Sequence, residues 1–97
     1  MKIPSKINIC GIIYDVIFES VKCNHMTEEA LWGNVIHREC VIYLNDTINT
    51  QKQWQTFFHE VTHAIAENYS IKINEDDVNR FANCFYQVLK DNQLLKE

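Results

Sequence analysis

Two histidines and a glutamate lie close together in the order His59-Glu60-Val-Thr-His63. If this stretch is helical, His59 and His63 lie one turn apart on the same face, so that both imidazoles can bind one metal ion. Glu60 lies about 100° further round the helix, where a carboxylate can take a proton from a water molecule on the metal. The spacing therefore predicts a Zn²⁺ site with Glu60 as its base, which is the chemistry of a hydrolase and in particular of a peptidase.

The residues around the motif predict the helix that it needs. Asn49 or Thr50 can cap its start. A helix is expected from about residue 51 to 68, with an apolar stripe formed by Trp54, Phe57, Phe58, Val61, Ala64 and Ile65. Both histidines flank this stripe, at the border between core and solvent. This placement favours a metal site that is accessible to a substrate. It argues against the alternative of two histidines on a solvated helix face.

A catalytic zinc site needs a third protein ligand. Residues 64–69 contain neither the glycine nor the third histidine of the longer histidine motif. The ligand is therefore expected from the next helix, predicted from Glu75 to about Asp91 behind the cap Asn74. Its first turn holds Glu75, Asp76 and Asp77, although the preference of helix N-termini for acidic residues would also explain this cluster.

The choice among the three carboxylates depends on which face of this helix is buried. The predicted buried stripe consists of Val78, Phe81, Ala82, Phe85, Val88 and Leu89. With Phe81 and Phe85 at its centre, Asp76 points away, whereas Glu75 and Asp77 flank the stripe at similar angles. Periodicity does not separate these two. Glu75 has the longer reach and begins the helix, so we favour Glu75, with Asp77 as the alternative.

The N-terminal half is rich in β-branched and aromatic residues and predicts two hairpins. The first has strands over 6–10 and 12–20, a turn around Cys10-Gly11, and an edge strand after Pro4. The second has strands over 32–36 and 39–45. Between them, residues 21–31 favour either a short helix capped by Thr27 or a loop. We predict one α+β domain over residues 1–97, with a small antiparallel sheet of two hairpins packed against two helices.

Composition excludes several classes of protein. The net charge is −4 and Lys and Arg do not cluster, which argues against nucleic-acid binding. No apolar run is long enough to span a membrane, and the N-terminus lacks the apolar core of a signal peptide. The four cysteines form no C-x-x-C pair, so they are interpreted as reduced thiols of a cytoplasmic protein.

Three segments together resemble a known family. They are His59-Glu-Val-Thr-His63-Ala-Ile, Asn74-Glu-Asp-Asp-Val-Asn-Arg-Phe-Ala82 and Tyr86-Gln-Val-Leu-Lys-Asp-Asn92. They resemble the small zincin-like proteins of phages and Gram-positive bacteria, distant relatives of the ImmA/IrrE metallopeptidases. Trp32-Gly33-x-Val35 and Val41-x-Tyr43-Leu44 are similar to the hairpin that precedes the motif helix in those proteins. The resemblance covers roughly residues 32–92, and its most specific part is the histidine motif.

The resemblance implies a minimal zincin-like fold and a zinc site with His59, His63 and a glutamate at the head of the next helix, here Glu75. It implies Glu60 as catalytic base and a protein or peptide as substrate. We expect the strand at 40–44 to pair with an extended peptide at the sheet edge. Two alternatives remain open: a zinc-binding regulatory protein without turnover, and an interaction domain without metal.

Overall fold

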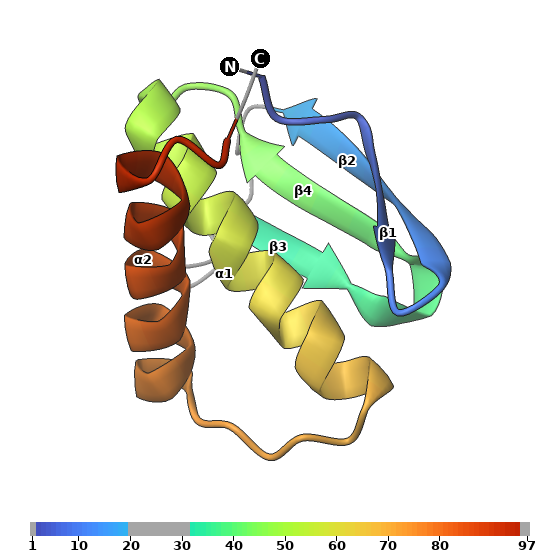
Figure 1. Ribbon diagram of the computed structural model, residues 1–97. Coiled ribbons are helices and arrows are strands. Elements are labelled where there is room, and N and C mark those ends of the chain that lie inside the picture. Colours follow the sequence, from blue (N-terminus) through green and yellow to red (C-terminus); the bar gives the residue numbers. More distant parts are fainter. Residues whose placement is uncertain (1, 20–31, 96–97) are drawn as a thin grey trace.

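The computed structural model describes residues 2–19 and 32–95, which form a four-stranded sheet and two helices (Figure 1). The elements are β1 (Lys6–Ile9), β2 (Ile12–Glu19), β3 (Gly33–Ile36), a 3-10 turn (His37–Glu39), β4 (Val41–Asn45), α1 (Thr50–Asn68) and α2 (Glu75–Asp91). The predicted α+β class is confirmed. Residues 21–31, for which a short helix capped by Thr27 or a loop was expected, lie outside the described residues.

The sheet is mixed, so the prediction of an antiparallel sheet was wrong in one respect. The strand order is β1-β2-β4-β3, and both hairpins are antiparallel as expected. The two hairpins meet through β2 and β4, which are parallel. Parallel neighbours need a connection of a dozen or more residues. In the described part of this connection, β3 and the 3-10 turn return the chain to the end of the sheet where β2 began.

This order makes β4 a central strand rather than an edge. Ile42 and Leu44 are almost fully buried, with 0% and 1% of their surface exposed. An incoming peptide therefore cannot pair with β4, which corrects the expectation for residues 40–44. The edges are β1, as predicted, and β3.

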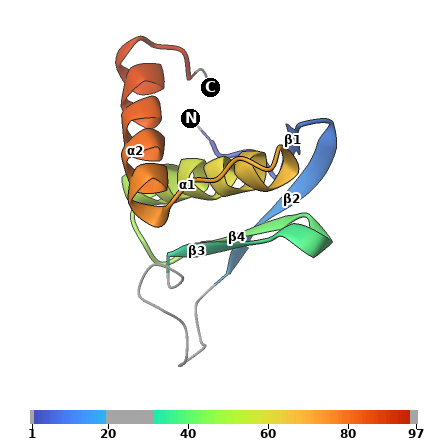
Figure 2. The same ribbon diagram turned by 90° about the horizontal axis from the view of Figure 1, so that it is seen from below.

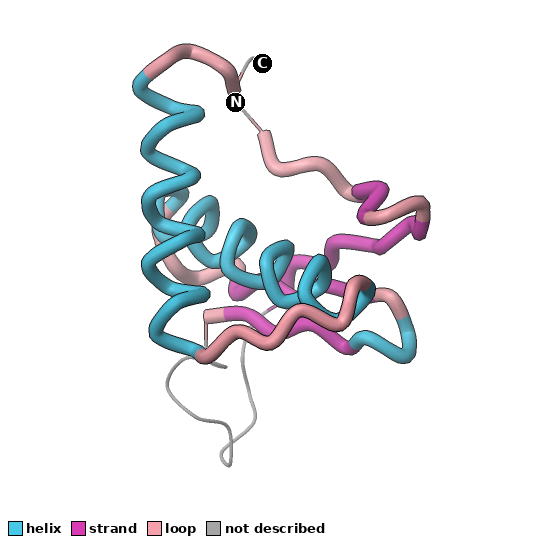
Figure 3. Tube along the Cα trace, turned by 60° about the horizontal axis from the view of Figure 1, so that its bottom comes forward, coloured by secondary structure: helices cyan, strands magenta, loops and turns pink. Residues whose placement is uncertain are grey.

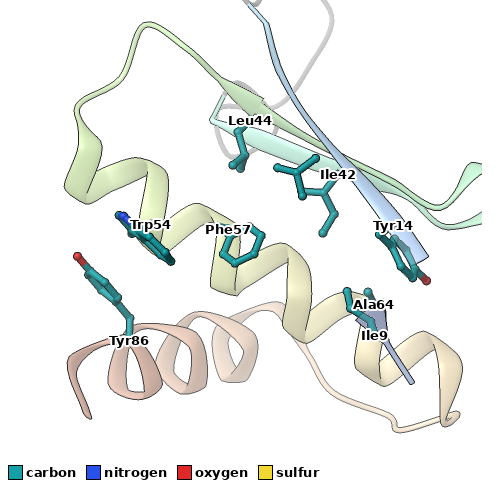
Figure 4. Close-up of a cluster of buried hydrophobic side chains, with 9 residues drawn as sticks. Ile9, Tyr14, Ile42, Leu44, Trp54, Phe57, Ala64 and Tyr86 are labelled. Atoms are coloured by element: carbon teal, nitrogen blue, oxygen red, sulfur yellow. The ribbon is translucent and has the colours of Figure 1, made fainter. Parts of the chain in front are cut away.

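Helix α1 lies across one face of the sheet, and α2 packs against α1 (Figures 1 and 2). The tube in Figure 3 shows the 69–74 connection passing from the end of α1 to the start of α2. Between the layers lies one apolar cluster, drawn in Figure 4, to which the sheet contributes Ile9, Tyr14, Val16, Ile42 and Leu44, and the helices Trp54, Phe57, Ala64 and Tyr86. The rings of Trp54 and Tyr86 stack with centroids 6.3 Å apart, and this contact joins α2 to α1.

The buried face of α2 overlaps the predicted one but is turned toward Tyr86. Val78 and Ala82 are buried as predicted, together with Tyr86, whereas Phe81 and Phe85 are 52% and 43% exposed. The apolar residues of α2 cover a band wider than the buried face, so periodicity alone placed the centre of that face incorrectly. The contact between Tyr86 and Trp54 of α1 determines how α2 is oriented, because it buries the large Tyr86 ring in a stacked arrangement in the core.

Gly33 allows β3 to approach α1 closely. A Cβ atom at this position would lie 2.5 Å from the Thr56 methyl carbon and 2.9 Å from the Tyr43 carbonyl oxygen. We expect Gly33→Ala to lower the free energy of unfolding by about 1–3 kcal/mol, as overpacking does elsewhere. Urea denaturation measures this loss. Adding Thr56→Ser, which removes the methyl group, should restore part of it; a double variant no more stable than Gly33→Ala would argue against this contact.

Candidate metal centre

Helix α1 holds the histidine motif in a fixed position. Asn49 caps its N-terminus by accepting a hydrogen bond from the Lys52 amide at 2.8 Å. At the other end the Asn68 side-chain amide donates to the Tyr14 hydroxyl at 2.9 Å and to the Ala64 carbonyl at 2.8 Å. The helix is therefore attached to the sheet near its C-terminus, close to the histidines.

The structure brings His59, His63 and Glu75 together. The Nε2 atoms of the two histidines lie 3.1 Å apart. One Glu75 carboxylate oxygen lies 2.6 Å from Nε2 of His59 and the other 3.0 Å from Nε2 of His63. Ligand atoms on one tetrahedral zinc ion lie about 3.3 Å apart, given bonds of about 2.0–2.1 Å. The ligand atoms of the three side chains lie within 4.8 Å of one another, so they are close enough to share one metal ion, and two imidazoles with one carboxylate suit zinc.

Glu75 rather than Asp77 meets the histidines because of the face that α2 buries. Each residue turns a helix by about 100°, which places Glu75 about 20° from the centre of the Val78, Ala82 and Tyr86 line. Asp77 lies about 140° from that centre. It is exposed and accepts a hydrogen bond from Arg80 at 3.0 Å. Asn74 caps α2, as predicted, by accepting from the Asp77 amide at 2.8 Å.

The cluster is buried on one side and open on the other. The side chain of His59 is 13% exposed, that of His63 28% and that of Glu75 43%. Burial lowers the pKa of His63, against an opposing effect of Glu75. Its ring is therefore neutral near pH 7, which is the form that binds metals. The open side on α2 leaves room for a further ligand such as water or substrate.

Glu60 lies beside the cluster and is almost completely enclosed, with 6% of its surface exposed. Burial, and then the charge of Glu75, raise the pKa of Glu60 from 4.5 to about 8 in the metal-free protein. A carboxyl with a pKa in this range can exchange a proton near neutral pH, as a general base or acid must.

The raised pKa predicts how the stability of the metal-free protein depends on pH. Between pH 4.5 and 8 the folded state holds a proton on Glu60 that the unfolded state has lost, so stability falls as the pH rises. The lowered pKa of His63 acts in the opposite direction, but only up to about pH 7.5, because above that pH its ring is neutral in both states. We expect the free energy of unfolding to fall by about 1–2 kcal/mol from pH 6.5 to 8. Urea denaturation after metal removal by EDTA measures this fall, and Glu60→Gln should abolish it. An equal fall in that variant would assign it to other groups.

A pocket of about 360 Å³ opens beside the motif, between α1 and α2. His59 and Glu60 line one end of it. The rest of its lining comes from three parts of the chain and comprises Trp32, Lys52, Gln55, Thr56, Asn79 and Asn83. The volume lies within the range of ligand-binding pockets, and Glu60 forms part of its lining.

The motif alone did not indicate these pocket residues. They lie on three separate segments, and no spacing rule connects Trp32 before β3 with Asn79 and Asn83 on α2. His37 lies in the 3-10 turn and is partly buried, and its Nδ1 atom is enclosed without a hydrogen-bond partner among the described residues.

No described helix is both long and apolar enough to cross a membrane. In comparisons with protein-family models, with curated proteins and with solved structures, nothing was found that matches the chain.

Proposed function

We propose that the protein is a zinc-dependent metallopeptidase that hydrolyses peptide bonds in a protein substrate. The observation on which this rests is the convergence of His59, His63 and Glu75 next to the buried carboxyl of Glu60. In this proposal the two histidines and Glu75 hold the metal ion. The resemblance to the zincin-like relatives of ImmA/IrrE metallopeptidases agrees with this assignment.

Zinc bound here would supply Lewis-acid polarisation of the scissile carbonyl and would lower the pKa of a water molecule toward about 7. Glu60 takes a proton from the attacking water and later gives it to the leaving amine. Its enclosure supports this role, because a buried carboxyl exchanges protons with the reacting groups more readily than with bulk solvent. Binding of the metal by His59 and His63 requires the neutral form of each imidazole.

The substrate backbone is expected to pair with β3, the edge strand next to α1. The free edge of a strand offers amide and carbonyl groups to an extended peptide. Gly33 brings this strand close to α1 at Thr56, one turn before Glu60. A peptide added to β3 would therefore pass along the helix that holds the motif.

Metal content and turnover test the proposal together. Protein purified without a histidine tag is expected to hold about one zinc ion per chain. It should cleave an unstructured protein such as casein, and cleavage should stop with a chelator and return with added zinc. Less than about a tenth of an equivalent of zinc would refute the metal site itself.

A zinc protein without turnover is the second candidate, and one observation favours it. The donor atoms come from both helices, so a metal ion would link the head of α2 to the middle of α1 whether or not a reaction follows. One zinc ion per chain with no cleavage of casein or of peptide libraries would favour this regulatory role. In that case removal of zinc should lower the thermal midpoint without affecting any activity.

A further inference from the structure

The pocket beside Glu60 carries one cationic side chain, and its position is set by an aromatic ring. The Lys52 ammonium lies 4.0 Å from the centroid of the Trp32 ring. Trp32 and Lys52 both line the pocket, at the end remote from the motif. A cation over an indole ring is attracted by the ring quadrupole, so this contact holds the ammonium group at the pocket.

Apart from Lys52 and the motif residues His59 and Glu60, the polar side chains that line the pocket are uncharged. Gln55 on α1 and Asn79 and Asn83 on α2 contribute three carboxamides. Each carboxamide has two N–H donors. Among the described residues that line the pocket, Glu60 is the only acid. The far end of the pocket therefore combines one positive charge with several N–H donors, which suits a carboxylate.

The charges near the motif do not cancel this preference. With zinc bound, its two positive charges offset the negative charges of Glu75 and Glu60. Lys52 then remains as the uncompensated charge of the pocket, so an entering anion meets a favourable field. The whole chain has a net charge of −4, so a positively charged pocket departs from the average surface.

A second cavity continues in the same direction. It has a volume of about 520 Å³ and shares Gln55 and Asn83 with the first. Arg80, Lys90 and Asp91 line it, and Arg80 is paired with Asp77 at 3.0 Å. The charges around this second cavity therefore nearly balance, and Lys52 is the cation that favours an acidic group in the first cavity.

The direction of proton transfer identifies which side this is. Glu60 gives its proton to the leaving amine, so that amine must lie against Glu60. Residues C-terminal to the cleaved bond then begin on the Glu60 side, where the pocket opens. Lys52 lies two helical turns before His59, roughly 10 Å along the axis of α1. The first or second substrate residue after the cleaved bond can span this distance with its side chain.

We propose that this pocket binds a carboxylate located within two residues C-terminal to the scissile bond, with Lys52 as the residue that selects it. This rests on the proposed peptidase function. The carboxylate can belong to an Asp or Glu side chain or to the free C-terminus of a short peptide, and the two sources share the same chemistry.

The first experiment measures binding without turnover, on the zinc-loaded Glu60→Gln protein. Acetyl-glutamate amide and acetyl-lysine amide are titrated while the side-chain amide signals of Asn79, Asn83 and Gln55 are followed by NMR. The glutamate compound is expected to bind at least about tenfold more tightly than the lysine compound, as a charge-assisted hydrogen bond implies. Lys52→Met, which keeps the stem over Trp32, should remove this difference, whereas Lys72→Met, on an exposed loop residue, should leave it unchanged.

In the second experiment the unsubstituted protein cleaves a library of peptides that are randomised at the two positions after the cleaved bond. Asp and Glu are expected to dominate, and Lys52→Glu should change the preference to Lys and Arg. Peptides that end in a C-terminal amide, compared with those that end in a free acid, distinguish a side-chain carboxylate from a terminal one. Cleavage without acidic preference would overturn the pocket assignment alone. No cleavage of any peptide, with glutamate still bound through Lys52, would overturn the peptidase proposal and leave the carboxylate site in place.

Discussion

Replacing Glu60 by Gln is expected to abolish peptide cleavage while the zinc ion stays bound. The carboxamide has nearly the same shape as the carboxyl but cannot take a proton from water. Loss of a general base lowers turnover by about 10²–10⁴-fold, so kcat should fall by at least a hundredfold. Zinc content should stay at about one per chain, because the proposed ligands are His59, His63 and Glu75.

The fold of this variant should be intact or more stable. The carboxyl of Glu60 is enclosed, and its deprotonation costs folding free energy in the metal-free protein near pH 8. Glutamine does not ionise, so the variant does not lose folding free energy in this way. Glu67→Gln is the matched control, since Glu67 is an exposed glutamate on the same helix. Cleavage that persists in Glu60→Gln at more than a tenth of the original rate would remove Glu60 from the role of base, whatever the zinc content.

Much of the fold was predictable from local signals. Cys10 and Gly11 both have positive φ, 56° and 86°, which fits the two-residue turn expected at this position. Asn49 and Asn74 cap the helices that they were expected to cap. These features depend on residues within a few positions of one another. The parallel pairing of β2 and β4 does not, because nothing within either strand specifies its neighbour in the sheet.

The third member of the cluster shows where sequence reasoning stopped. The helix containing Glu75 and Asp77 was placed correctly, but the centre of its buried face was not, although Val78 and Ala82 are buried as predicted. With the whole predicted stripe taken as the buried face, periodicity did not separate the two carboxylates. With the observed face of Val78, Ala82 and Tyr86, only Glu75 points toward α1. Which of two apolar faces is buried depends on tertiary contacts such as the stacking of Tyr86 on Trp54, and these are not encoded in the periodicity of one helix.

The pocket was less predictable still. Its cation, Lys52, lies in the first turn of α1, where a lysine is an ordinary solvated residue. Its importance comes from Trp32, which precedes β3 and lies 20 positions earlier in the chain. The aromatic ring comes near the helix because β3 packs closely on α1 through Gly33. The close approach of two elements therefore brings Lys52 and Trp32 together at the pocket, and neither element shows this alone.

Replacing Glu75 by Ala is expected to have the largest effect on metal binding of any single change on α2. It removes the carboxylate that contacts both histidines and leaves two ligands on α1. Zinc affinity should fall by at least about 100-fold, because the loss of a residue that only hydrogen-bonds to a metal ligand already lowers affinity by about 10–100-fold. Competition with a chromogenic chelator measures this fall. Glu75→Gln, which keeps one oxygen donor but no charge, should lose less than Glu75→Ala.

Asp77→Ala provides the comparison that separates this site from general acidity at the head of α2. Both variants remove one negative charge from the same helical turn, so both weaken its favourable interaction with the helix dipole by similar amounts. Asp77 contacts Arg80 and is more than half exposed at its side chain, 53%, so its loss should change zinc affinity by less than about threefold. Equal losses in the two variants would mean that zinc responds to overall charge at this helix end. A large loss with Asp77→Ala alone would reinstate Asp77 as the ligand and would place the buried face of α2 on its other side.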